Sequence, residues 1–402
     1  MNKSLAVVMM LTFSMIVNFL HGDLQSQYKK GPITLKGEKN FGEKNDWEAL
    51  FFDRYREMII APDGNILVAN SRQDNFYKFD KQGNFIKKFG QHGEGPGDVY
   101  SPGELSILDN KYLVAGEYAS RRRITVWDFD GNCKKVVKTI KNPFFPTSLK
   151  ENKIAYLTFS QPPEEKNGFQ EKTQIIIKDI ETGTEKIIQE ISLLDRSEIM
   201  LGKNMSTNIG NFFGEVFLSK TLDGNLLVGI SNQPRIKILS PTGKEIFSFN
   251  LKISPIPIDS AYIKKFRDYT LSELYSKDEA SMDSTHKFWH ELDKKVFRTY
   301  DFSTIFDKQL PLYYEILVDS DGNFLVFKYS DCLENCKTFF QVYSSKGEFI
   351  CETELDKGIY DFEIDRRFKN ICFTTEGILG LFINKGDDED VLRLIKSKYP
   401  AD

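Results

Sequence analysis

Short apolar stretches separated by polar turns recur along most of the chain. In the first copy of one recurring unit, an alternating strand, a turn glycine and a second strand read Phe76-Tyr-Lys-Phe-Asp-Lys-Gln-Gly83-Asn-Phe-Ile. The other copies have their turn glycines at Gly131, Gly183, Gly243 and Gly347. Alternation with a period of two places one side of each strand in a core, and glycine permits the positive φ that a tight reversal requires. Each copy therefore predicts a β-hairpin.

A second kind of hairpin precedes this unit in several copies. At its first occurrence it reads Ile59-Ile-Ala-Pro-Asp-Gly64-Asn-Ile-Leu-Val, and its turn glycine recurs at Gly224 and Gly322. Two hairpins in succession give four strands, and a four-stranded meander that repeats in tandem is typical of the blades of a β-propeller.

The strand pattern is interrupted between Asp259 and Tyr300, where apolar residues occur at spacings of three and four and predict helices. From Asp361 onward the sequence gives a sixth, more divergent blade. Residues near Gly31 could supply the outer strand of that blade and close the ring, because an open ring leaves strand edges exposed. The predicted fold is all-β, a six-bladed β-propeller of four-stranded antiparallel blades, with a helical insertion at about 259–300 between blades four and five.

The N-terminus has the order of a secretory signal peptide. An apolar stretch from Leu5 to Leu20 follows Lys3 and precedes a polar run that begins at His21. We expect a signal peptide over residues 1–22, and a single propeller domain over 23–402 that is periplasmic or secreted. Leu20 is larger than the residue usually found at that distance from a cleavage site, so an uncleaved anchor is the alternative. No other integral membrane span is expected.

The composition is that of a folded protein. Hydrophobic residues make up 40% of the chain and aromatic residues 13%, which is enough for a packed core. The formal net charge is -4, and neither sign of charge forms a long run. We therefore expect no nucleic-acid partner.

Five cysteines are present, an odd number that leaves at least one thiol single in an oxidising compartment. Cys332 and Cys336 are the closest pair, and a disulfide between them could clip a hairpin loop. Free thiols are the alternative, and a metal site would need more Cys or His ligands nearby.

One segment resembles an NHL repeat. It reads Phe89-Gly-Gln-His-Gly-Glu-Gly-Pro-Gly-Asp-Val-Tyr-Ser-Pro102 and is followed by Arg123-Ile-Thr-Val-Trp-Asp-Phe-Asp-Gly131. Elsewhere the likeness is limited to turns and strands, and the chain as a whole resembles the exported six-bladed propeller family of bacteria. That family is largely without an assigned activity, so the resemblance implies architecture and location only.

Glu57 and Glu315 are candidate metal ligands. Each stands seven residues before its turn glycine, at the start of an expected innermost strand that lines the channel. Two carboxylates at a channel mouth could hold a hard cation such as Ca²⁺. Phe217 occupies this register in blade four, however, and the pattern fixes no third acid. We interpret both as solvated rim carboxylates, with a Ca²⁺ site as the alternative and no other cofactor.

Histidines offer two further candidates. His286 and His290 are one helical turn apart in the insertion and could donate two imidazoles to Zn²⁺, but the sequence offers no third ligand. The glycine-rich loop Gly90–Gly97 opens no helix that could bind a phosphate, so we expect it to connect two blades. His92 in this loop could act as an acid or a base, although no catalytic partner is visible.

A run of three arginines, Arg121 to Arg123, begins a strand, and Arg235 begins the corresponding strand of a later blade. We interpret the run as solvated or as part of a blade edge.

These observations lead to two functions. The first is a binding or interaction module for a peptide, a glycan or a partner protein, with the insertion at 259–300 capping or extending one face. The alternative is a metal-dependent hydrolase or lyase of lactone or ester type, with Glu57 and Glu315 as ligands in the central channel and a bound water as nucleophile. A scaffolding role in an envelope assembly is a third possibility. The sequence does not identify the ligand.

Overall fold

The computed structural model describes residues 23–38, 41, 57–117, 122–160, 170–194, 198–202, 205–208, 214–276, 283–299, 308–329, 337–356, 360–361, 371–384 and 392–399. The expected signal peptide at residues 1–22 lies outside this part of the chain, as do Cys332 and Cys336. Within the described residues, no helix is both long and apolar enough to cross a membrane.

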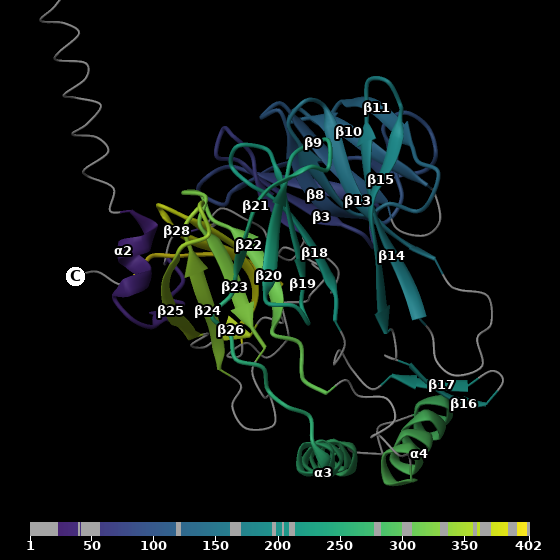
Figure 1. Cartoon of the computed structure of the whole chain (residues 1–402). Helices are drawn as coiled ribbons and strands as arrows, with labels where there is room; N and C mark the ends of the chain where they lie inside the picture. Colours follow the sequence, from purple (N-terminus) through teal and green to yellow (C-terminus); the bar gives the residue numbers. More distant parts are fainter. Residues whose placement is uncertain are drawn as a thin grey trace, which may run out of the picture.

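Five sheets contain four antiparallel strands each that follow one another along the chain, as the paired hairpins predicted (Figure 1). Their strands are β2 (Met58–Ile60), β3 (Ile66–Asn70), β4 (Asn75–Phe79) and β5 (Phe85–Phe89); β8 (Pro102–Leu108), β9 (Tyr112–Glu117), β10 (Arg123–Asp128) and β11 (Cys133–Lys138); β12 (Phe144–Leu149), β13 (Lys153–Ser160), β14 (Gln170–Asp179) and β15 (Glu185–Leu194); β18 (Val216–Lys220), β19 (Leu226–Ile230), β20 (Arg235–Leu239) and β21 (Glu245–Asn250); β22 (Tyr313–Val318), β23 (Phe324–Lys328), β24 (Thr338–Tyr343) and β25 (Phe349–Asp356).

The sixth sheet is the least regular. Strand β28 (Gly377–Asn384) pairs with β29 (Leu392–Ser397) along one edge. Along its other edge it pairs with β27 (Ile371–Thr374) and with the two-residue strand β26 (Tyr360–Asp361). The chain therefore forms the divergent last blade that the sequence predicted.

The six sheets form a ring because they share their cores. Among the described residues, one cluster of buried apolar side chains lies between each sheet and the next along the chain. A further cluster joins Leu381 and Leu394 of the last sheet to Met58 and Val68 of the first. Burial of these apolar faces is the main term that favours the folded ring.

The N-terminal segment closes the ring. Helix α2 (Leu24–Lys29) and strand β1 (Ile33–Thr34) lie against the β22–β25 sheet, and β1 runs parallel to β25. Gly37 forms an antiparallel bridge with Ser397 of β29. The prediction that residues near Gly31 supply the outer strand of the last blade is wrong, because β1 joins the neighbouring sheet. The residues that follow β1 contact the last sheet and so help to close the ring.

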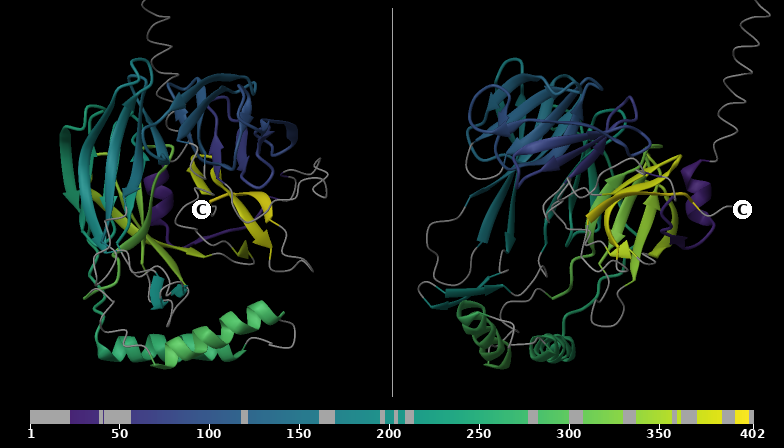
Figure 2. Two further views of the ribbon diagram at one scale, coloured as in Figure 1. Left: turned by 90° about the vertical axis from the view of Figure 1, so that its right-hand side faces the viewer. Right: turned by 180° about the vertical axis from the view of Figure 1, so that it is seen from behind.

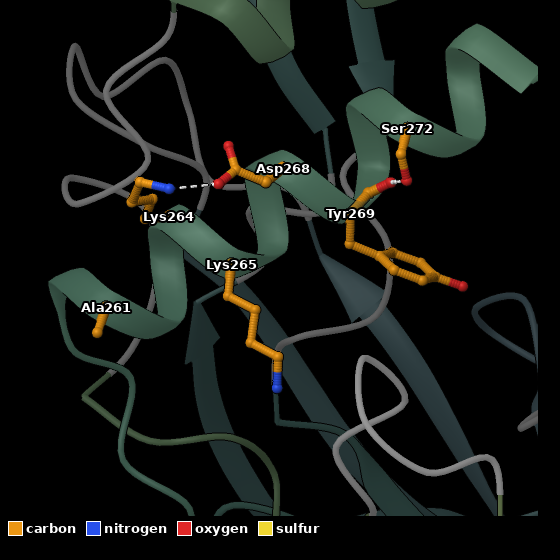
Figure 3. Close-up of a pocket in the computed structure, with 6 residues that line it drawn as sticks. All are labelled: Ala261, Lys264, Lys265, Asp268, Tyr269 and Ser272. Carbon is orange, nitrogen blue, oxygen red and sulfur yellow. Dashed lines mark hydrogen bonds and ion pairs between the residues drawn. The ribbon is translucent and has the colours of Figure 1, made fainter.

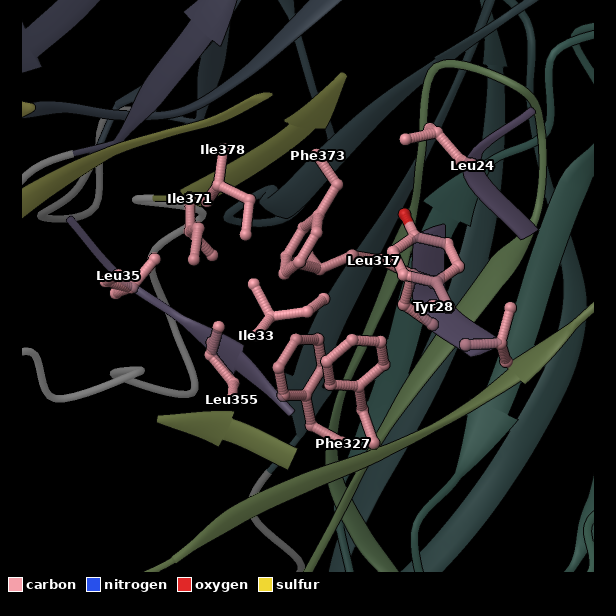
Figure 4. Close-up of a cluster of buried hydrophobic side chains, with 13 residues drawn as sticks. Leu24, Tyr28, Ile33, Leu35, Leu317, Phe327, Leu355, Ile371, Phe373 and Ile378 are labelled. Carbon is pink, nitrogen blue, oxygen red and sulfur yellow. The ribbon is translucent and has the colours of Figure 1, made fainter. Parts of the chain in front are cut away.

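The closing segment is held by a buried cluster (Figure 4). Leu24, Tyr28, Ile33 and Leu35 contribute its N-terminal side chains, which pack between the β22–β25 sheet and strands β27 and β28. The Tyr28 hydroxyl donates to Oδ2 of Asp319 at 2.9 Å, and burial raises the pKa of that carboxyl.

Two insertions extend the ring. Strands β16 (Glu198–Gly202) and β17 (Met205–Asn208) form a separate pair, and helices α3 (Ser260–Ser276) and α4 (Ser284–Thr299) follow β21 and precede β22. The helical insertion is thus observed. We predicted that the insertion lies between blades four and five. That numbering applies only if the β16–β17 pair is not counted as a blade. If that pair is counted as the fourth sheet after β12–β15, the helices separate the fifth sheet from the sixth.

In three of the sheets, the second turn glycine packs against the outer strand of the sheet before it. Gly131 has φ +76°, and a Cβ placed on it would lie 2.7 Å from the ring of Phe89 at the end of β5. Gly243 and Gly347 meet Ile188 and Phe249 in the same way, and Gly83 meets Phe41 of the N-terminal segment. Phe41 therefore takes the position that an outer-strand residue has elsewhere.

This packing predicts unequal costs for two glycine substitutions. Gly131→Ala should lower the free energy of unfolding by about 2–4 kcal/mol, because it adds a crowded methyl group to a left-handed backbone. Gly183→Ala is the control: its φ is +74°, but no atom lies within 4 Å of the added Cβ. It should cost only the backbone term of about 1–2 kcal/mol. Urea unfolding measures both, and equal losses would contradict the tight contact with Phe89.

Candidate functional site

One face of the ring carries the insertions. In a four-stranded meander, the inner strand begins at one face of the ring. The turn between the second and third strands and the connection to the next sheet lie at that same face. The β16–β17 pair and helices α3 and α4 belong to such connections, and both lie beyond the ring on the same side (Figures 1 and 2). We call this side the insertion face.

Glu57 and Glu315 lie where their inner strands begin at the insertion face, but they are not solvated. Glu57 is only 3% exposed and Glu315 only 5% exposed. Oε1 of Glu315 accepts a hydrogen bond from the backbone N–H of Ile316 at 2.7 Å. The interpretation of both as solvated rim carboxylates is therefore wrong, because the packed starts of the inner strands cover their side chains.

Glu104 is a third buried carboxylate in the same register, which the sequence analysis missed. The turn of its hairpin contains no glycine; Asp109 and Asn110 adopt positive φ instead. The N–H of Lys111 bonds to the Leu108 carbonyl as the turn glycines do in other sheets. Glu104 stands seven residues before Lys111. The Asp-Asn turn was therefore the sequence signal that could have revealed Glu104 as a member of this register.

Glu104 is held between two sheets. Its backbone has φ +53°, and its Oε2 accepts a hydrogen bond from the N–H of Phe145, in β12 of the next sheet, at 2.5 Å. Within the described residues, no group of three His, Cys, Asp or Glu side chains is placed to hold a metal ion. The sheet β26–β29 separates the strands of Glu57 and Glu315.

The histidine pair of the insertion is described only in part. His290 is buried on α4, whereas the side chain of His286 lies outside the described residues. Zinc binding by this pair stays a prediction.

The glycine-rich loop connects two sheets, as predicted. It leads from β5 to β8 and contains the short parallel pair β6 (Gln91–His92) and β7 (Asp98–Val99). Asp98 braces the loop from within: its Oδ2 accepts from the N–H of Gly95 and its Oδ1 from Nε2 of Gln91, each at 2.8 Å. These hydrogen bonds lower the pKa of Asp98.

Arg123 anchors this connector. Its Nε donates to both carboxylate oxygens of Glu117 at 2.7 Å, and both side chains are buried. Its terminal nitrogens donate to the carbonyls of Glu94 and Gly93 at 3.1 Å. The interpretation of Arg123 as a solvated residue is therefore wrong, because its side chain is buried beneath the connector that it holds.

His92 has a partner that the sequence did not reveal. Its Nδ1 lies 2.5 Å from Oδ2 of Asp74, which belongs to the turn between β3 and β4. The two are 18 positions apart in the sequence, and only the meander brings that turn beside the connector. No local motif could have indicated the pair.

The opposite face contains a partly buried amine. Nζ of Lys220, at the end of β18, donates to the Ile107 carbonyl of β8 at 2.8 Å and so joins two sheets that are not consecutive. Burial lowers the pKa of Lys220, while the charge of Asp109 opposes that shift.

A shallow recess follows the outside of α3 (Figure 3). All six residues that line it belong to this one helix, among them Tyr269 and the ion pair of Lys264 with Asp268 at 2.5 Å. Since no second element contributes to it, the recess is part of a helix surface rather than a cavity.

The architecture and the comparison with known families agree. A family model described as a 6-bladed beta-propeller matches residues 56–226. Together with the ring of six sheets, this match identifies the chain as a six-bladed β-propeller.

Similar solved structures include three bacterial proteins. A "Putative exported protein" of Bacteroides fragilis is 11% identical over 87% of each chain, with a TM-score of 0.44. A member of the duf4221 family from Bacteroides vulgatus is 13% identical over 92% of this chain and 98% of its own, with a TM-score of 0.48. Virginiamycin B lyase from Staphylococcus aureus is 12% identical over 84% and 79%, with a TM-score of 0.38. No curated protein matches the chain.

The two corresponding arginines predict different losses of stability. Arg123→Ala should cost about 3–5 kcal/mol, because it leaves Glu117 buried without its charge partner. Arg235 begins the corresponding strand β20, but its ion pair with Glu245 is exposed. Arg235→Ala should therefore cost at most about 1 kcal/mol. Chemical denaturation measures both, and similar losses would show that the buried pair does not anchor the connector.

Proposed function

We propose that this protein is an exported propeller that binds a peptide, a glycan or a partner protein across the insertion face. The observation that carries the proposal is the placement of helices α3 and α4 and the β16–β17 pair beyond the same side of the ring (Figure 2). The ring itself is complete without these elements, so they enlarge one surface rather than a core.

The helices form a defined pair. Phe266 of α3 and Phe297 of α4 are both buried, with ring centroids 5.9 Å apart. The ring of Tyr275 lies beneath two cations of α4, Lys294 at 4.9 Å and Arg298 at 5.2 Å. These contacts hold the two helices together, so that they present a fixed surface.

Two aromatic side chains of this pair point into solvent. Tyr269 is 43% exposed and Phe288 is 56% exposed. Exposed aromatic rings supply large contact areas at low entropic cost, which suits the recognition of a sugar ring or a peptide side chain. They are the residues that we expect to contact the ligand.

The insertion joins the ring through two antiparallel segments. The N–H of Ile258 donates to the Lys308 carbonyl, and the N–H of Leu310 donates to the Ile256 carbonyl, each at 2.9 Å. Because its two ends lie side by side, the insertion can be exchanged for a short turn.

The N-terminal sequence supports export to the periplasm or the outside of the cell. Its apolar stretch from Leu5 to Leu20 is bounded by Lys3 and by the polar residues from His21 onward, the order of a secretory signal.

A metal-dependent hydrolase or lyase is the second candidate. The burial of Glu57, Glu104 and Glu315 at one register of three inner strands favours it, because such carboxylates suit a hard cation. In this candidate Glu57 and Glu315 would hold Ca²⁺, and the bound cation would supply Lewis-acid activation of water for ester or lactone cleavage.

Removal of the insertion tests the binding function. A variant in which residues 259–307 are replaced by a Gly-Ser linker of about four residues should keep the melting temperature of the ring. It should lose the ligand that the full chain binds on glycan and peptide arrays. The double variant Tyr269→Ala/Phe288→Ala should weaken the same binding at least about tenfold, which corresponds to a loss of about 1.4 kcal/mol. Binding that survives the deletion would contradict the proposal.

Metal binding is tested separately. If the second candidate holds, Ca²⁺ raises the melting temperature of the purified protein by mass action, and a chelator reverses the shift. The shift should disappear in Glu57→Gln and in Glu315→Gln, whereas Glu38→Gln, a change outside this register, should keep it. An unchanged melting temperature in saturating Ca²⁺ would rule out the Ca²⁺ site.

A further inference from the structure

The contact between His92 and Asp74 lies at the insertion face, between the turn β3–β4 and the connector from β5 to β8. Both oxygens of the Asp74 carboxylate are engaged. Oδ2 lies 2.5 Å from Nδ1 of His92, and Oδ1 accepts from the N–H of Ser101 at 2.5 Å. A carboxylate in contact with Nδ1 selects the tautomer that carries its proton on Nδ1, which leaves Nε2 with a lone pair.

The two members of the pair differ in exposure. The side chain of Asp74 is largely covered, whereas 63% of the His92 side chain is exposed. Asp74, whose carboxylate orients the imidazole, is thus covered by the protein, whereas the imidazole of His92 faces solvent. A free Nε2 on an oriented imidazole is the arrangement that general-base chemistry requires.

The surrounding structure holds this geometry in place. The ring of Tyr100 meets the His92 ring edge-on, with centroids 5.2 Å apart. The N–H of Tyr100 donates to Glu117, the partner of the buried Arg123. Asp74 itself has φ +54°, a conformation that costs free energy and that is found at functional sites more often than elsewhere.

We propose that His92, oriented by Asp74, is the general base of a hydrolytic site for small esters or lactones on this face of the propeller. This activity goes beyond ligand binding by the helices and uses neither their residues nor the channel carboxylates. Esters and lactones suit such a pair, because their hydrolysis needs only water and a group that takes a proton and returns it.

In the proposed hydrolysis, Nε2 of His92 takes a proton from a water molecule while the water oxygen forms a bond to the carbonyl carbon of the ester. Asp74 stabilises the imidazolium that results. The bond from the carbonyl carbon to the leaving alkoxide then breaks, and the alkoxide takes the proton from Nε2. An acid and an alcohol leave, or a hydroxy acid if the substrate is a lactone.

The test uses the full mature chain with p-nitrophenyl acetate and γ-butyrolactone as probes. Hydrolysis should exceed the buffer rate. Charged and titratable groups near the imidazole include Asp74 on the turn and Tyr100 on the connector, and the Glu117–Arg123 pair holds the connector. His92→Gln should lower the rate by about 10²-fold.

Asp74→Asn distinguishes orientation from folding. Asparagine tolerates the left-handed backbone, so the melting temperature should stay close to that of the parent. The rate should fall at least about tenfold, because the variant lacks the carboxylate that orients the imidazole and stabilises the imidazolium formed in the reaction. Nitrogen NMR should show that the preference for a proton on Nδ1 is weakened.

Lys346→Gln is the control, because this exposed side chain lies in the turn between β24 and β25 of another sheet and should not affect hydrolysis. Parent hydrolysis at the buffer rate, or a folded His92→Gln variant with the parent rate, would overturn the proposal. Neither result would affect the proposed binding by the insertion, which the deletion tests independently.

Discussion

The ring depends on the contact between the N-terminal segment and the last two sheets. Each sheet shares its apolar core with both neighbours, so a gap at one position would expose two apolar faces and two strand edges. Helix α2, strand β1 and Phe41 fill that gap. The contact includes the Tyr28 hydroxyl on the buried Asp319, and burial of that carboxyl is offset by Asn323, which donates to it through its backbone and its side chain.

The polar residues of the insertion face have different structural roles. Glu117 and Arg123 are buried and fix a connector, and Glu104 ties the start of one inner strand to the next sheet. His92 is held by the same network but faces solvent. The ring thus supports a few exposed side chains, while helices α3 and α4 belong to an insertion that lies outside the ring. This division explains how one propeller frame accommodates different functions.

The sequence predicted the fold well because strand alternation and turn glycines are local signals. Gly83 and Gly131 mark the hairpins directly, and the spacing of apolar residues marks the helices. The site was less predictable, because its residues meet only after folding. Asp74 and His92 come from two different loops, and burial of Glu57 depends on how the inner strands converge. Glu104 was missed because Asp109 and Asn110 replace the glycine that would have marked its register.

The hydrogen bonds that hold the N-terminal segment on the ring join distant parts of the chain. They therefore determine the order in which parts of the protein fold. Leu24 and Asp321 are 297 positions apart, and Tyr28 and Asp319 are 291 positions apart. Pairing within a sheet involves neighbours in sequence and is fast, whereas closure over such distances is slow. The apolar face of the first sheet that the last sheet covers is therefore exposed until the ring closes. During folding, this interval is the period in which the protein is most prone to aggregate.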